Sequence, residues 1–474
     1  VSTSIDELFA GDSNSATNDG TASETARLNY FGRVDYDYAG KYLFQFNWRY
    51  DGSENFPKGN RFGFFPGVSM GWRISEEKFW KEHVKWMDYL KLRASWGQMG
   101  NDKVSAFQYV TAYTFSNPGV FGANGGKENT GLRLNRTANP NITWEVADTW
   151  NVGIESNFLD YFNFEGDFFV TKRSNILTAR NAAIPEYAGL SLPDENIGKC
   201  KSIGTEFTLG YNRQLNKDWG LHLSGNFSYS HGTIDYIDEP AETLEWQRRT
   251  GKTIGTQGSN YLMYESIGIF RTQDDLDSYP HLSDARVGDV KFRDVNGDKK
   301  IDGDDKVRMD KPAVPEIMYG INLGTTYKNW SLNMLWQGAA RVWQYTFMEA
   351  GIIGNFTKDF YDNRWTEDNP NAKYPRTYNR DATVTGGGNY RNSFWLNNAS
   401  YLRLKSIELA YSCPKSWFKG TPISGVRLCL TGYNLLTFTG IKNIDPETQE
   451  NSQGWAAWNT PQSKVYNFGI NVTF

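Results

Sequence analysis

The chain has 474 residues and a formal net charge of −4, so it lacks the basic surplus that is typical of nucleic-acid-binding proteins. It contains 29 Phe, 27 Tyr and 17 Trp, and its 46 Gly far outnumber its 16 Pro, a composition that suits many pleated strands. No apolar run is long enough for a transmembrane helix, so the chain could span a membrane only as a closed β-barrel.

Residues 1–25 are rich in Ser, Thr, Asn, Asp and Gly, which predicts an exposed loop segment. Strand patterning begins abruptly after it, at 26–37 and 41–51. In the second of these strands Tyr42, Phe44, Phe46, Trp48 and Tyr50 share one face, opposite Gln45, Asn47, Arg49 and Asp51. Such an aromatic stripe is rare in soluble sandwiches and is typical of a barrel strand that faces lipid on one side.

The same alternation recurs along the chain and predicts about thirteen barrel strands. They are 26–37, 41–51, 62–75, 88–101, 144–156, 161–174, 198–213, 218–231, 316–328, 330–342, 400–413, 424–438 and 464–474. The segment 400–413 is irregular, because Leu402 and Leu404 are out of phase with Ile407 and Leu409. This predicts a β-bulge, or an upper half that stands above the membrane.

The predicted connections form a short class and a long class, as in outer-membrane barrels. The short class comprises 38–40, 157–160, 214–217, 329 and 414–423, together with a short helix at 76–87. The long class comprises 102–143, 175–197, 232–315, 343–399 and 439–463, with a smaller loop at 54–61. Alternating strand directions then place the long loops and 1–25 on one side, provided that the strand-like run 261–271 belongs to a loop.

The last strand, 464–474, is amphipathic and by itself fits either a soluble sheet or a lipid-facing one. The aromatic stripes of the other strands favour lipid. An odd number of strands also predicts a complementary piece with an odd number, because single-chain bacterial barrels have even counts. The start at Val1, without Met or a signal peptide, is read as that of a fragment or a processed product.

Neither the cysteines nor the histidines predict a bridge or a metal centre. Cys413 and Cys429 are too far apart in the expected hairpin for a disulfide, so Cys200, Cys413 and Cys429 are expected to be free thiols. The four histidines are scattered, without metal-ligand spacing. No Ser/His/Asp set, spaced carboxylate pair or phosphate-binding loop stands out, so we expect no enzyme.

The segment 294–305 carries the strongest local motif, because its oxygen-bearing residues have the spacing of a twelve-residue calcium loop. The candidate ligands are Asp294, Asn296, Asp298, Lys300 (through its carbonyl), Asp302 and Asp305. The segment departs from that loop at Lys299, where glycine is usual, and at Asp305, where a bidentate Glu is usual. A structural calcium or magnesium site is one interpretation, and a solvated acidic turn without metal is the other.

Tryptophans in the long loops are the candidate solute-binding residues, because aromatic faces stack on sugar rings and line peptide pockets. They are Trp246, Trp343, Trp365, Trp395, Trp455 and Trp458. The alternative is that each of them packs its loop or contacts a partner protein.

Several stretches together resemble the C-terminal part of the SusC/RagA class of TonB-dependent outer-membrane transporters. They include Arg61–Ser75, Leu90–Asn101, Asp294–Asp298, Asn363–Thr366, Ser400–Lys405, Tyr433–Phe438 and Ile444–Glu447, and they span nearly the whole chain. The resemblance implies an all-β transmembrane barrel of about 22 strands around a plug, of which 26–474 supplies the C-terminal portion and 1–25 an extracellular loop.

The resemblance also implies partners and a function. The implied partners are the missing plug and N-terminal strands, a SusD-like surface lipoprotein, the TonB complex and outer-membrane lipid. A dimer of transporter–lipoprotein pairs is a further option. The expected function is active import of a large solute, an oligosaccharide or, alternatively, an oligopeptide; a passive structural barrel and a secreted calcium-stabilised glycan hydrolase are the other options. The long loops would be extracellular and the C-terminus periplasmic, and the terminal Phe474 looks like an outer-membrane assembly signal.

Overall fold

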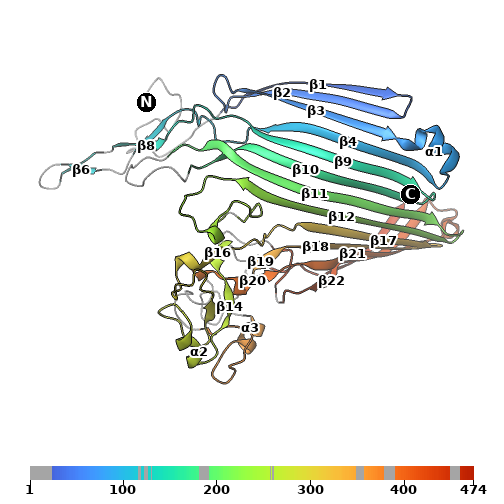
Figure 1. The fold of residues 1–474 in the computed structure, drawn as a ribbon. Coiled ribbons are helices and arrows are strands. Elements are labelled where there is room, and N and C mark those ends of the chain that lie inside the picture. The colour runs from blue at the N-terminus through green and yellow to red at the C-terminus, as the bar shows by residue number, and fades with distance from the viewer. Residues whose placement is uncertain are drawn as a thin grey trace.

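The computed structural model describes residues 24–115, 119–121, 126–129, 131–180, 192–256, 258, 261–347, 357–377, 390–442, 444–448 and 460–474. Their backbone is organised around one antiparallel sheet of 13 strands, ordered as they follow one another in the chain (Figure 1). The strands are β1 (Arg27–Tyr38), β2 (Tyr42–Ser53), β3 (Phe62–Arg73), β4 (Met87–Asn101), β9 (Glu145–Phe158), β10 (Phe162–Thr178), β11 (Glu195–Gln214), β12 (Trp219–Tyr236), β17 (Ile317–Tyr327), β18 (Trp330–Ala340), β21 (Tyr401–Ser412), β22 (Gly425–Thr439) and β23 (Val465–Thr473). Each of the thirteen predicted strands is confirmed.

Alternation of side chains gives the sheet two different faces. In the first hairpin Tyr36 lies opposite Phe44 and both rings are exposed, as are Phe468 and Ile470 in the last strand. Apolar stripes of this length are unfavourable in water and match the lipid-facing band of a transmembrane barrel. The two edge strands, β1 and β23, each have one hydrogen-bonded neighbour within the described chain.

Three central strands are longer than a membrane requires. β10, β11 and β12 have 17, 20 and 18 residues, whereas about 9–11 suffice for a tilted spanning strand. The lengths predicted from the sequence are too short. The predicted segments 161–174, 198–213 and 218–231 stop short of the strand ends on the side of the long loops. The wall therefore continues beyond the apolar band on that side.

Compact turns join the strands at one end of the sheet. In the first turn Asp37 accepts a hydrogen bond from the backbone N–H of Gly40 at 2.7 Å. Ala39 and Gly40 adopt positive φ angles of 55° and 67°. Left-handed residues match the right-handed twist of the flanking strands, so this turn needs few residues.

The helix predicted at 76–87 is wrong in its extent. A 3-10 turn, η2 (Ile74–Glu76), is followed by α1 (Lys78–His83), and the chain is extended again at Val84. Glu77 separates the two pieces with an extended backbone, and Lys41 Nζ and Tyr42 Oη hold its carboxylate at 2.9 and 2.8 Å. No helix in the described ranges is long and apolar enough to cross a membrane.

Beyond the other end of the sheet, the described residues of 237–315 and 343–399 form a folded unit that we call the loop module (Figure 1). Its elements are η4 (Glu245–Gln247), β13 (Leu262–Tyr264), β14 (Ser266–Ile269), α2 (Gln273–Ser278), β15 (Val290–Phe292), η6 (Gly303–Asp305), β16 (Lys306–Arg308), β19 (Trp343–Tyr345), α3 (Lys358–Asn363), η8 (Ser393–Trp395) and β20 (Leu396–Asn398). Buried aromatic rings, among them Tyr345, Phe347, Phe360 and Trp395, form its core.

The strand-like run 261–271 belongs to this module, as predicted. β13 pairs with β16, and β14 pairs with β15, so neither strand joins the large sheet. The connection 102–143 also contains short pairs that the sequence did not predict: β5 (Ala112–Phe115) with β8 (Leu132–Arg136), and β6 (Gly119–Phe121) with β7 (Lys127–Asn129).

The irregularity predicted in 400–413 is a β-bulge. The register of β21 shifts between Leu404 and Ser406 against both of its neighbouring strands. Against β18 the extra residue is Lys405, which shifts the alternation for the lower half of β21. Against β22 the extra residue lies on β22, because Asn434 and Leu435 together oppose Lys405. The expectation of three free cysteines is also confirmed.

Candidate functional site: the inner wall and the loop module

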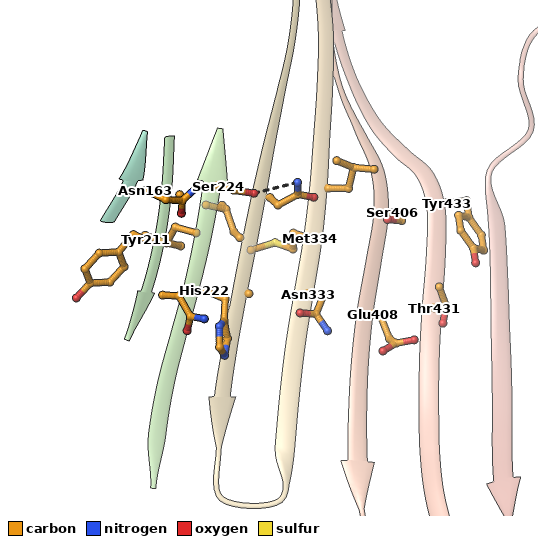
Figure 2. Close-up of a pocket in the computed structure, with 17 residues that line it drawn as sticks. Asn163, Tyr211, His222, Ser224, Asn333, Met334, Ser406, Glu408, Thr431 and Tyr433 are labelled. Atoms are coloured by element: carbon orange, nitrogen blue, oxygen red, sulfur yellow. Dashed lines mark hydrogen bonds between the residues drawn. The ribbon is translucent and has the colours of Figure 1, made fainter. Parts of the chain in front are cut away.

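The face opposite the apolar stripes is polar and forms an open hollow of about 610 Å³ near the short turns. Figure 2 shows His222 and Ser224 from β12, Asn333 from β18, Glu408 from β21 and Thr431 from β22 along this hollow. Most of these groups are neutral and can both donate and accept hydrogen bonds. The hollow therefore suits water, polar protein or a polar solute rather than an apolar ligand.

Ion pairs line the same face further towards the N-terminus. The guanidinium of Arg93 lies 3.0 Å from Glu155, 3.1 Å from Glu165 and 2.6 Å from Asp167. Gly153 makes room for it, because a Cβ at that position would lie 2.8 Å from Arg93 and from Asp167. Lys91 also pairs with Glu155, at 3.1 Å, so two cations face three carboxylates and this part of the wall stays acidic.

The acidic loop 294–305 folds through its own hydrogen bonds. Asp294 accepts from the backbone N–H of Gly297 at 2.7 Å and of Lys299 at 3.0 Å. Asn296 accepts from Asp298, and Asp298 accepts from Lys300. Lys299 has a positive φ of 66°, so it adopts the left-handed turn at the position where calcium loops carry glycine.

The other end of this loop is held by carboxylates that point back at the backbone. Asp305 is buried, and its two oxygens accept from the N–H groups of Val295 at 2.8 Å and Asp302 at 2.9 Å. Asp302 in turn caps the 3-10 turn η6 by accepting from Asp304. Among the described residues, no three His, Cys, Asp or Glu side chains gather as a metal-binding group. The calcium site therefore stays a prediction.

The structure places four of the six candidate tryptophans in the loop module, and two of them pack in its core. Trp395 is 1% exposed, which leaves no ring face for a solute, so its expected binding role is corrected to core packing. Trp343 packs against the same cluster. Trp455 and Trp458 lie outside the described residues.

The remaining two tryptophans border polar parts of the module. Trp246 donates from Nε1 to the carbonyl oxygen of Asp304 at 2.7 Å, so it braces the acidic loop. Trp365 is half-buried beside Arg376, whose guanidinium lies 5.9 Å from the centre of its ring. The terminal Phe474 is exposed just beyond β23.

A buried charge cluster that the sequence did not predict ties the last long loop to the wall. Arg403 on β21 is 2% exposed, and its Nη2 lies 2.7 Å from Asp445 while Nη1 lies 3.0 Å from Glu447. Lys405 also reaches Glu447, at 2.7 Å. We call these four residues the loop clamp. They come from Ser400–Lys405 and Ile444–Glu447, two of the stretches that carry the family resemblance.

Both carboxyls of the loop clamp are held in the ionised form. Burial alone would raise their pKa values. For Asp445, hydrogen bonds from the backbone N–H of Glu447, from Arg403 and from the backbone N–H of Gln462 outweigh burial and keep the pKa below its ordinary value. For Glu447, hydrogen bonds from Lys405 and Tyr401 do the same. The clamp thus contains two cations and two anions.

Comparison with known proteins identifies the family. Residues 3–444 match the family described as "TonB dependent receptor-like, beta-barrel". TonB-dependent receptor P3 of Formosa agariphila is 30% identical over 95% of this chain and 46% of its own length. TonB-dependent receptor SusC of Bacteroides thetaiotaomicron is 26% identical over 96% of this chain and 44% of its own length. The chain therefore spans about half the length of the curated relatives it matches.

Solved structures agree with this assignment. The RagAB peptide transporter covers 100% of this chain with a TM-score of 0.73 and 25% identity, and this chain covers 50% of it. The relatives carry the names of receptors and transporters rather than of enzymes. The open sheet of β1–β23, with its apolar outer face and polar inner face, is a C-terminal part of the same barrel. The chain belongs to the SusC/RagA class of TonB-dependent receptors of the bacterial outer membrane.

Proposed function

We propose that this chain supplies the C-terminal wall, the loops and the closing strand of an importer that takes a large solute across the outer membrane with energy from the TonB complex. The observation that carries the proposal is the two-faced sheet of 13 strands, apolar outside and polar inside, in a chain of this family. A sheet with two unpaired edges needs further strands to close, and a plug inside it would make transport depend on an energy source.

The orientation follows from the two classes of connection. The loop module would lie outside the cell, and the short turns and Phe474 would lie in the periplasm. A SusD-like lipoprotein would cover the loop module, and the remaining plug and strands would complete the lumen. The same arrangement allows a dimer of two transporter–lipoprotein pairs.

An oligosaccharide is our first choice of solute and an oligopeptide the second. The polar inner wall supports a hydrogen-bonding solute, which fits both. The similarity to the solved RagAB peptide transporter favours the second choice. In either case the acidic loop 294–305 would serve as a structural element, with calcium as its proposed ion; calorimetry on the chelator-treated full-length protein tests this, and absence of binding removes the ion.

Surface labelling of the full-length protein tests the orientation. In a cysteine-free background of the full-length protein, in which Cys200, Cys413 and Cys429 of this chain are replaced by serine, Lys299→Cys would mark the loop module and Lys217→Cys the short turn between β11 and β12. A membrane-impermeant maleimide applied to intact cells should label residue 299 and leave residue 217 unlabelled until the cells are opened. Labelling of residue 217 alone would reverse the topology, and recovery of the protein outside the outer-membrane fraction would remove the proposal.

A further inference from the structure

An aromatic band borders the outer, apolar face of the sheet at the end of the short turns, where Figure 1 marks α1 and the C-terminus. Between ring centres, Trp86 lies 6.5 Å from Phe158, which stacks on Phe162 at 5.1 Å. Phe162 in turn lies 4.8 Å from Tyr211. We call these four residues the aromatic rim. Such girdles lie at the interface between lipid and water, so the rim places this level of the sheet at the lipid headgroups.

Arg213 brings a positive charge to the same face. The outward positions of β11 alternate as Phe207, Leu209 and Tyr211, and the next one is Arg213. The register does not shift there, because Arg213 pairs with Leu221 of β12. β11 is the seventh of the 13 strands, so the strands that would close the barrel join far from it. The exposed side chain of Arg213 therefore faces the lipid headgroups rather than the lumen.

The guanidinium of Arg213 is supported by an aromatic ring. Its Cζ lies 4.2 Å from the ring centre of Tyr161, which packs edge-on against Tyr211 at 5.8 Å. Within the described parts of the chain, Arg213 forms no ion pair with a carboxylate. A cation–π contact uses the face of the guanidinium and leaves the N–H donors in its plane for another acceptor. Arg213 is thus a fixed, outward-facing donor group at headgroup level.

The short connections near Arg213 are basic, although the chain as a whole has a net charge of −4. The four connections after β9 on this side are 159–161, 215–218, 328–329 and 413–424. Their charged residues are four lysines, Lys217, Lys328, Lys415 and Lys419, and two carboxylates, Asp160 and Asp218. The backbone N–H of Lys328 donates to the carbonyl oxygen of Asp218 at 2.8 Å, so two of these turns lie side by side. A surplus of cations at a membrane surface attracts anionic headgroups.

We propose that Arg213, stacked on Tyr161, binds the phosphate of an anionic phospholipid in the leaflet around the short turns. A guanidinium binds phosphate through two parallel hydrogen bonds, and the lysines of the neighbouring turns add a less specific attraction. The aromatic rim packs against the upper part of the same lipid, which a free phosphate ion would not offer. The inference goes beyond import and rests on the proposed function only for the orientation, which makes this the periplasmic leaflet.

The test uses the full-length transporter with its lipoprotein partner, stripped of lipid and kept in a neutral detergent. Phosphatidylglycerol is titrated into the complex, and native mass spectrometry gives the dissociation constant of the first lipid that binds. Phosphatidylcholine, whose headgroup carries no net charge, should bind more weakly to the wild type. Arg213→Gln removes the charge from an exposed side chain and should weaken the binding of phosphatidylglycerol about tenfold, as expected for the loss of one charge-assisted contact.

Arg427→Gln is the matched control, because it makes the same change near the same end of the sheet. Arg427 lies on β22 and pairs at 2.6 Å with Glu408, which lines the hollow of the inner face. Lipid does not reach that face, so this variant should bind phosphatidylglycerol like the wild type. Tyr161→Leu leaves the charge in place but removes the ring below it, and it should weaken binding about threefold.

Three results would overturn the lipid site. They are equal affinity for phosphatidylglycerol in the wild type and in Arg213→Gln, an equal loss in Arg213→Gln and Arg427→Gln, and equal affinity of the wild type for the two lipids. Failure of this site differs from failure of the import function, because the titration needs neither solute nor TonB. Without the lipid site the wild type still takes up solute in a TonB-dependent manner, whereas failure of import abolishes that uptake and leaves lipid binding intact.

Discussion

Replacing Arg403 with Met should release the last long loop from the wall. The substitution keeps most of the side-chain volume of Arg403 but removes its charge and three hydrogen bonds: to Asp445 at 2.7 Å, to Glu447 at 3.0 Å and to the hydroxyl of Thr437 at 2.9 Å. Both carboxylates then stay buried with one cation fewer. Removing only one partner of a buried ion pair destabilises the fold, because it leaves a buried charge uncompensated.

The structure sets the size of the effect. Removing one partner of a buried pair typically costs about 3–5 kcal/mol. In the variant, Lys405 still pairs with Glu447. Asp445 still accepts hydrogen bonds from the backbone N–H groups of Glu447 and Gln462. We therefore expect the low end, about 3 kcal/mol, which raises the population of the open loop about 100-fold. The sheet itself should stay folded, because this energy is lost locally.

Amide hydrogen exchange measures this directly. The N–H of Glu447 donates to the side chain of Asp445 at 2.9 Å, and that of Thr448 donates to its carbonyl at 3.1 Å, so both should exchange about 100-fold faster in the variant. Arg427→Met is the matched control, because Arg427 pairs with Glu408 at 2.6 Å on the next strand but is 42% exposed. It should leave these two amides unchanged. Equal protection in Arg403→Met and in the control would refute the role of the loop clamp.

Three further changes test other parts of the structure. Lys299→Gly should stabilise the acidic loop by about 0.5–1 kcal/mol, because a left-handed φ is costly for any residue except glycine; unchanged exchange of its amides would contradict this. Gly153→Ala should displace the flexible end of Arg93 from Asp167 and lower the stability of the assembled barrel by about 1 kcal/mol in thermal unfolding. Gly97→Ala, whose nearest atom is 3.6 Å from the new Cβ, should not, and equal midpoints would contradict the steric argument. Deleting Phe474 should lower the yield of assembled barrel in outer-membrane fractions without changing solute affinity, and a normal yield would speak against an assembly signal.

The large sheet could be predicted from the sequence because each of its strands repeats the same two-residue alternation between an apolar and a polar face. The alternation of strand directions, which places all the long loops on one side, then assigned 261–271 to a loop, although the run itself resembles a strand. The ends of β10–β12 were missed because above the apolar band no lipid imposes an alternation. Pairs as short as β13–β16 have three residues on each side, too few for a period to appear.

The site was less predictable because its contacts join distant positions. Trp395 reads as a loop aromatic in the sequence, yet it lies against Phe347, Phe360 and Tyr374, which folding alone brings together. Arg403 and Asp445 are 42 positions apart. Their two stretches were recognised as family features, but nothing in their spacing shows that one neutralises the other. Opposite charges within two such stretches are the signal that could have suggested the pairing.

Uptake of the solute recovered from the intact complex tests the central claim most directly. Cells that produce the full-length protein with its lipoprotein partner should accumulate this solute, labelled with a radioisotope, only when TonB is functional. Deleting TonB or collapsing the proton gradient should reduce uptake to the level of cells without the transporter. Undiminished uptake in the absence of TonB would contradict the account and would identify the barrel as a passive channel.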